Sequence, residues 1–200
     1  MKREELTASF LREIETLREE LIESTSRILQ FETISGAADP AGQARCRQQI
    51  EGCAAWLREL TARMGFRWIE SAPAGRWFAI EWPAASRAAR PQIGVPTHID
   101  VVPVGEGWTH PPFSGAVADG FIWGRGAQDD KGPLIAALYG LYALKRAGFR
   151  PPVTYRIIIG TQEEIGDWSD LREYLDQQGA PDFGFTPDAI VEAAKDQIAG

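Results

Sequence analysis

The chain has 200 residues, of which 44% are hydrophobic, and this is enough material for one substantial core. Asp and Glu number 28 against 21 Lys and Arg, so the formal net charge is −7. This acidic balance argues against nucleic acid as the main partner, because neutralising phosphates requires a basic surface. No stretch is long and apolar enough to span a membrane, and the charged N-terminus does not resemble a secretory signal. We therefore expect a cytoplasmic protein.

The first third of the chain is predicted to be helical. Apolar residues recur at helical spacing through residues 4–30, which predicts one long amphipathic helix. A loop containing Pro40-Ala41-Gly42 follows, and residues 43–64 form a second predicted helix. Cys46 and Cys53 lie two helical turns apart in it, about 10 Å, which is too far for a disulfide bond. Both are expected to be free thiols in a reducing cytosol.

The rest of the chain alternates short apolar runs with helical stretches. Strands are predicted at 66–70, 77–82, 92–99, 121–123, 153–159 and 183–185, and helices at 133–147 and 169–178. This alternation predicts an α/β layered domain. Ligand sites in such sheets gather at the carboxyl ends of the strands, so the functional residues are expected among the polar residues that directly follow a strand.

The tripeptide His98-Ile99-Asp100 ends one of these strands. Neutral imidazole is the commonest metal ligand in proteins, and it usually needs an oxygen acceptor on its other ring nitrogen. A carboxylate two residues along an extended segment lies on the same face and can provide that acceptor. A histidine near a strand end is more often structural, so this motif needs support from the acidic residues downstream.

A glycine-punctuated loop, Gly124–Gly132, enters the predicted helix at 133–147. A phosphate cradle is the first alternative, since glycine amides and a lysine are its usual components. Here Asp129 and Asp130 would repel a phosphate and attract a divalent cation, and glycine rather than Ser or Thr follows Lys131. Aspartates at a helix entry also commonly act as N-caps. We expect one aspartate to cap the helix and the other to bind a cation.

Adjacent glutamates, Glu163-Glu164, follow the predicted buried strand 153–159 directly. Such a pair is usually a solvated loop. The two side chains can also divide a reaction between them, with one binding a metal ion and the other handling a proton. The segment alone does not decide between these interpretations.

Together these motifs resemble the co-catalytic zinc peptidase family that includes succinyl-diaminopimelate desuccinylase, acetylornithine deacetylase, aminoacylase and carboxypeptidase G. Within it they are most similar to the bacterial Xaa-His dipeptidase, or dipeptidase V, branch. The order and spacing of the motifs make a specific match over about half of the chain. The matching segments are His98–Gly105, Gly107–Phe113, Gly124–Gly126, Asp129–Pro133, Gly160–Glu164 and Phe185–Ala189.

The resemblance implies a site for two metal ions. His98 would bind one ion, with Asp100 orienting its imidazole, and Asp129 would bridge both ions. The peptide bond from Asp129 to Asp130 would be cis. Zinc is the expected metal, with two ions in a complete site, and Co²⁺ or Mn²⁺ would be substitutes.

The resemblance also assigns the remaining acidic residues. Glu163 would be the general base and later the general acid in amide hydrolysis. Glu164 would bind the second metal ion, and Asp188 would bind the first. The implied substrates are dipeptides. The alternative is an N-acyl amino acid deacylase or desuccinylase.

The implied fold is a three-layer α/β/α zinc-peptidase-like catalytic domain with a mixed sheet, incomplete at its C-terminal side. Residues 1–200 would be the N-terminal portion of that domain, without the family's lid or dimerisation domain. The family's second metal ion takes a further histidine from far downstream, which these 200 residues do not contain.

Two local departures from the family pattern also stand out. Pro96 and Thr97 replace an aliphatic residue and a glycine, and Pro96 removes a backbone donor from a predicted central strand. From Ile190 onward a helix-like ending replaces the usual acidic residue, Phe and Pro. We therefore expect the isolated chain to bind metal weakly and to turn over slowly or not at all. The alternative of another class is a non-catalytic remnant with a partial metal site.

Overall fold

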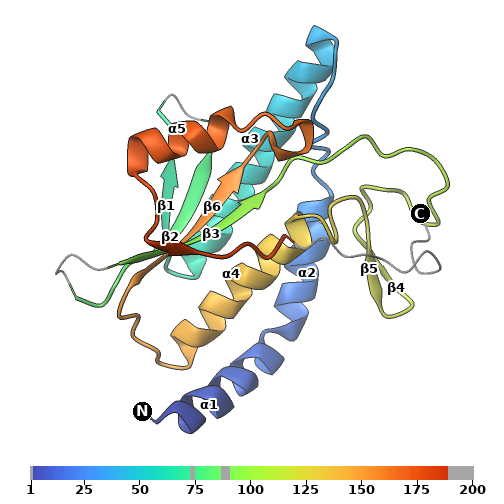
Figure 1. The fold of residues 1–200 in the computed structure, drawn as a ribbon. Helices are drawn as coiled ribbons and strands as arrows, with labels where there is room; N and C mark the ends of the chain where they lie inside the picture. Colours follow the sequence, from blue (N-terminus) through green and yellow to red (C-terminus); the bar gives the residue numbers. More distant parts are fainter. Residues whose placement is uncertain (1, 73–74, 87–90, 189–200) are drawn as a thin grey trace.

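The computed structural model describes residues 2–72, 75–86 and 91–188 (Figure 1). The helix-like ending predicted beyond Asp188 lies outside these residues. In chain order the elements are α1 (Arg3–Thr16), α2 (Arg18–Leu29), α3 (Pro40–Arg63), β1 (Arg67–Glu70), β2 (Phe78–Trp82), β3 (Gln92–His98), β4 (Ala116–Ala118), β5 (Phe121–Trp123), α4 (Lys131–Arg146), β6 (Thr154–Gly160), the 3₁₀ turn η1 (Glu163–Ile165), α5 (Ser169–Gln178) and β7 (Phe183–Gly184).

Five of the strands form one mixed sheet in the order β1-β2-β6-β3-β7. β3 runs parallel to both β6 and β7, whereas β2 is antiparallel to β1 and β6. The register of β3 against β6 pairs His98 with Gly160, so both strands end side by side. The expected mixed α/β sheet is confirmed, and its central parallel pair brings two of the predicted motifs to one edge.

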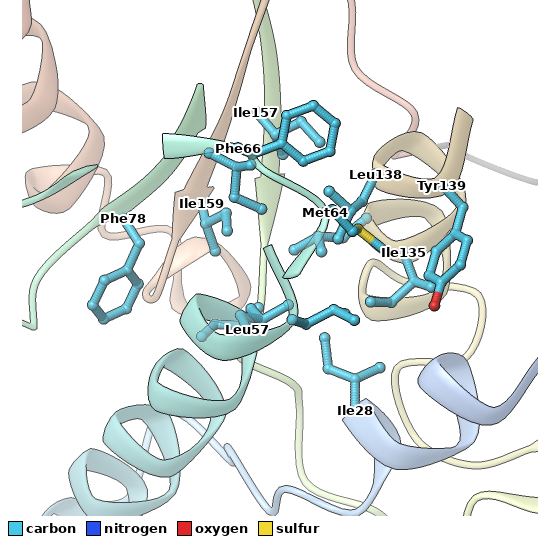
Figure 2. Packing of buried hydrophobic residues seen from close by; sticks show 14 of the residues in the cluster. Ile28, Leu57, Met64, Phe66, Phe78, Ile135, Leu138, Tyr139, Ile157 and Ile159 are labelled. Atoms are coloured by element: carbon cyan, nitrogen blue, oxygen red, sulfur yellow. The ribbon is translucent and has the colours of Figure 1, made fainter. Parts of the chain in front are cut away.

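Helices cover both faces of the sheet, which gives three layers (Figure 1). Successive residues of a strand point to opposite faces. Phe78 and Ile80 accordingly join the main apolar cluster with α2, α3 and α4, while Trp77 and Ala79 join a smaller cluster beneath Tyr174 of α5. Figure 2 shows side chains of the main cluster, among them Ile28, Leu57, Ile135, Leu138, Ile157 and Ile159.

The prediction of one long helix over residues 4–30 is wrong, although the segment is helical. The chain forms two helices, α1 and α2, that meet at Leu17 and point in different directions (Figure 1). The Leu17 side chain is fully buried, and both helices contact α4. A continuous pattern of apolar residues is compatible with either arrangement, and packing against α4 decides it.

The second predicted helix begins earlier than expected, because Pro40 is its first residue rather than part of a loop. Proline suits this position, since the first helical N–H has no acceptor within the helix. Asp39 caps the helix by accepting a hydrogen bond from the Gly42 N–H at 2.8 Å. Cys46 and Cys53 on this helix are free thiols, as predicted.

Pro96 lies inside β3 without disrupting the sheet. The carbonyl oxygens of Gly94 and Pro96 accept hydrogen bonds from the Phe185 N–H and the Thr186 hydroxyl, at 3.2 and 3.1 Å. These carbonyls therefore face away from β6, and the missing N–H of Pro96 faces the same way. Pro96 therefore removes no hydrogen bond from the ladder with β6. It removes none from the ladder with β7 either, because β7 pairs only with Ile93 and Gly94.

Among the residues that the structure describes, no helix combines the length and the hydropathy needed to cross a membrane.

Candidate metal centre

The candidate site lies at the carboxyl end of the β3–β6 pair. His98 is the last residue of β3, and its side chain is only 2% exposed. Its Nδ1 lies 3.0 Å from the carbonyl oxygen of Asp100 and 3.4 Å from a carboxylate oxygen of the same residue. Because a carbonyl only accepts hydrogen bonds, Nδ1 carries the proton and donates it. Nε2 is left as the nitrogen that faces the site.

Carboxylates surround the Nε2 atom of His98. Asp129 lies 2.9 Å from it, Glu163 lies 3.8 Å away and Asp188 lies 3.9 Å away. Ligand atoms of His98, Asp129 and Glu164 all lie within 4.8 Å of one another, which makes them a candidate metal-binding group. The structure thus brings the proposed ligands from four separate segments together, although Asp188 lies outside that three-residue group.

The Asp129–Asp130 pair forms the entrance to α4. Their peptide bond is cis, as the family resemblance implies. Asp130 occupies the N-cap position, but its side chain makes no capping hydrogen bond, so the prediction of a side-chain cap is wrong. Its Oδ2 instead accepts a hydrogen bond of 3.1 Å from the His98 N–H. That N–H points away from β6 and, being buried, requires an acceptor.

Residues 161–164, hereafter the glutamate loop, follow β6 and carry both candidate glutamates. Asp100, which is fully buried, accepts hydrogen bonds from the Glu163 N–H at 3.2 Å and from the Glu164 N–H at 3.1 Å. One carboxylate therefore contacts the imidazole of His98 and fixes the backbone of both glutamates. The sequence predicted only the contact with the imidazole.

The acidic surroundings shift the pKa of His98. Burial alone lowers it, but hydrogen bonds to Asp100 and Asp129 outweigh burial and raise the pKa of His98 to about 11. The hydrogen bond to His98 correspondingly lowers the pKa of Asp129. Both shifts favour a protonated imidazole beside an ionised carboxylate in the metal-free protein, in the place where a metal cation would join them.

The other acidic groups shift in the opposite direction. Burial, together with the neighbouring carboxylates, raises the pKa of Glu163 and of Glu164. Burial likewise raises the pKa of Asp130 to about 7, and its Oδ1 has no hydrogen-bond partner among the described residues. A site that concentrates this many acidic groups around one imidazole is stabilised by a bound cation.

The donor set fits a divalent metal ion of the zinc type. Zinc and its neighbours in the first transition row accept imidazole nitrogen and carboxylate oxygen together, whereas Ca²⁺ and Mg²⁺ prefer oxygen alone. His98 offers Nε2 with its other nitrogen fixed by a hydrogen bond, which is the usual arrangement of a metal-binding histidine.

Zinc binding by the metal-free chain should release at least one proton. Imidazole binds a metal only in its neutral form, and a pKa of about 11 leaves His98 protonated at neutral pH. Affinity should therefore rise with pH, because less work is needed to remove that proton. Calorimetric titration in two buffers with different ionisation enthalpies measures the release, and identical heats in both buffers would contradict it.

The position of the Lys131 side chain argues against a phosphate-binding site in the Gly124–Gly132 loop. Its side chain is fully buried, and Nζ donates a hydrogen bond of 2.7 Å to the carbonyl oxygen of Phe31. Burial lowers the pKa of Lys131 to about 8. An amine held inside the core in this way cannot reach a phosphate on the surface, so the lysine ties the loop to the N-terminal helices instead.

The family model for peptidase family M20/M25/M40 matches residues 94–197, which is just over half of the chain. A putative dipeptidase, YtjP, of Bacillus subtilis is 37% identical over 194 residues, covering 92% of this chain and 39% of its own length. The Beta-Ala-Xaa dipeptidase of Lactobacillus delbrueckii subsp. lactis is 46% identical over 99 residues, which is 49% of this chain and 21% of that protein.

The fold is similar to that of human carnosine dipeptidase 1, with a TM-score of 0.75 at 23% identity over 92% of this chain and 41% of the human chain. This chain thus spans about two fifths or less of the length of these relatives. The family model covers all four segments that supply the candidate ligands, from the end of β3 to Asp188. The chain belongs to peptidase family M20/M25/M40.

Proposed function

We propose that this chain forms the metal-binding part of a metal-dependent amide hydrolase that cleaves dipeptides. The observation that carries the proposal is the convergence of His98, Asp129 and Glu164 within 4.8 Å, at the end of the central parallel strands. The names of two relatives, a putative dipeptidase and a Beta-Ala-Xaa dipeptidase, support the choice of dipeptides.

Four side chains would hold the metal ions: His98, Asp129, Glu164 and Asp188. Once bound, two such ions supply a water molecule acidic enough to react at neutral pH and polarise the amide carbonyl of the substrate. The family resemblance makes Asp129 the candidate bridge between the ions, and its carboxylate lies 2.9 Å from the Nε2 atom of His98. These assignments are part of the proposal.

Glu163 is the proposed general base. Its carboxylate lies 3.8 Å from His98 Nε2, beside the metal-binding group but not within it. Its raised pKa suits a group that must take a proton from the attacking water and hold it briefly. The same carboxylic acid then delivers that proton to the leaving amine nitrogen, which restores Glu163 for another cycle.

The test is an assay of the 200-residue chain with added Zn²⁺ or Mn²⁺ on a panel of dipeptides, β-alanyl dipeptides included, and on N-acyl amino acids. We expect slow hydrolysis that EDTA abolishes, with dipeptides preferred. Preference for N-acyl amino acids would favour the deacylase alternative. Failure of the chain to bind Zn²⁺ or Mn²⁺ would contradict the proposal, and metal binding without hydrolysis of either substrate class would favour a non-catalytic remnant.

A further inference from the structure

We infer that Asp170 is a positioning residue that holds the glutamate loop in the place required for metal binding. It lies in the first turn of α5, outside the matching motifs, and its side chain is only 2% exposed. The effect on metal binding rests on the function proposed above, whereas the effect on the loop does not.

The carboxylate of Asp170 joins α5 to the beginning of the glutamate loop. Its Oδ2 accepts a hydrogen bond of 2.6 Å from the Thr161 N–H and lies 3.5 Å from the Thr161 hydroxyl. Its Oδ1 accepts a hydrogen bond of 2.7 Å from the Leu171 N–H. Both oxygens therefore accept from backbone N–H groups, that of Thr161 being buried and that of Leu171 partly buried. A side chain with a single acceptor oxygen cannot replace them.

The packing around this carboxylate is close. A Cβ atom on Gly160 would lie 3.2 Å from Asp170 Oδ2, so the absence of a side chain at Gly160 makes room for the contact. Among the described residues, no ion pair joins Asp170 to a cation. A buried carboxylate that pairs with no cation is retained for the neutral donors that it satisfies. Two of these donors, the N–H and the hydroxyl of Thr161, belong to the glutamate loop.

Asp170 and Asp100 hold the loop from opposite ends. Asp170 binds the N–H of Thr161, and Asp100 binds the N–H groups of Glu163 and Glu164. Between them, the Ser169 hydroxyl donates a hydrogen bond of 3.0 Å to the side chain of Gln162. Every residue of the loop thus has at least one such contact. Thr161 has a second, because its hydroxyl donates a hydrogen bond of 2.8 Å to the carbonyl oxygen of Arg76. Removing the Asp170 carboxylate therefore loosens the backbone at the start of the segment that carries the proposed ligand Glu164.

Helix α5 has other anchors, so a substitution at Asp170 need not detach it. Tyr174 is 1% exposed and packs edge-on against Trp77, with ring centroids 5.1 Å apart. Its hydroxyl accepts a hydrogen bond of 3.1 Å from Arg156. The helix therefore stays on the sheet while the contact with the loop is changed.

The experiment compares Asp170→Asn with Asp167→Asn. Asp167 is exposed and also serves the start of α5, since its Oδ1 accepts a hydrogen bond of 2.9 Å from the Ser169 N–H. Among the described hydrogen bonds, none joins Asp167 directly to the loop. Amide hydrogen exchange is followed by NMR in the metal-free proteins. We expect exchange at Thr161, Glu163 and Glu164 to be accelerated about tenfold or more in Asp170→Asn and unchanged in Asp167→Asn.

Titration with Co²⁺ gives the second measurement, because its visible absorption spectrum reports the coordination geometry. Asp170→Asn should weaken Co²⁺ affinity by about tenfold and alter the spectrum, as expected for a residue that supports a ligand. Unchanged exchange at the loop would overturn the inference, as would equal acceleration throughout the sheet. If the wild-type chain bound no Co²⁺, the proposed function would fail, while the exchange data would still decide the role of Asp170 in the loop.

Discussion

Glu163→Gln should lower the rate of dipeptide hydrolysis by about 10²–10⁴-fold while changing metal affinity by less than about threefold. Glutamine has nearly the same shape as glutamate but cannot take a proton at neutral pH. The hydrogen bond that fixes residue 163 comes from its backbone N–H to Asp100, so the substitution leaves it intact. Glu163 also lies outside the group of His98, Asp129 and Glu164.

Turnover with excess protein over substrate, combined with a Co²⁺ titration, separates the two effects. Glu59→Gln is the matched control, because Glu59 is exposed on α3 and far along the sequence from every proposed ligand. A Glu163→Gln chain with more than about a tenth of the wild-type rate would show that another group moves the proton. A large loss of metal affinity would instead make Glu163 a ligand.

Asp100→Ala should weaken metal affinity by about 10–100-fold, because the imidazole of His98 and the backbone of both glutamates lose a common partner. It should also destabilise the metal-free chain by about 2–4 kcal/mol, since two partly buried N–H groups and the buried imidazole of His98 lose an acceptor. Few single substitutions in this chain would disturb the site and the fold together. Guanidinium unfolding without metal measures the stability, and Co²⁺ titration measures the affinity.

Asp176→Ala is the control for this second substitution, since Asp176 is an exposed aspartate on α5. It should change neither quantity appreciably. An Asp100→Ala chain as stable as the wild type would show that water replaces the carboxylate as the acceptor for the loop. Full metal affinity in that chain would show that the carbonyl oxygen of residue 100 alone orients the imidazole.

Much of the fold could be predicted because its elements leave strong local signals. β6 is a run of β-branched residues that pairs on both sides, and its bounds differ from the prediction by about one residue. β4 was missed, although Asp119-Gly120 forms the two-residue turn that joins it to β5, with φ of 53° and 82°. Three-residue strands carry too little periodicity to detect, so the Asp-Gly pair was the better signal.

The candidate site could be predicted in part, because the ends of parallel strands can be inferred from the sequence whereas individual hydrogen-bond partners cannot. Sequence order and residue type place His98 and Glu164 after parallel strands, and parallel strands end together. The hydrogen bonds of Asp130 and Asp170 depend instead on which buried N–H groups lack a partner, and only the folded backbone shows this. The catalytic and ligand roles, and the position of residues 1–200 within a larger catalytic domain, stay predictions.

Pro96 has a consequence for association between molecules. β7 pairs with β3 only as far as Gly94, and beyond that point a strand from another chain could pair with β3 only through free backbone groups. The carbonyl oxygen of Pro96 on this side already accepts a hydrogen bond from the Thr186 hydroxyl. Proline gives such a strand no N–H at residue 96, and Asp130 already occupies the N–H of His98. Pro96 therefore makes it unfavourable for a strand of another molecule to pair with this side of β3, which disfavours aggregation through this edge.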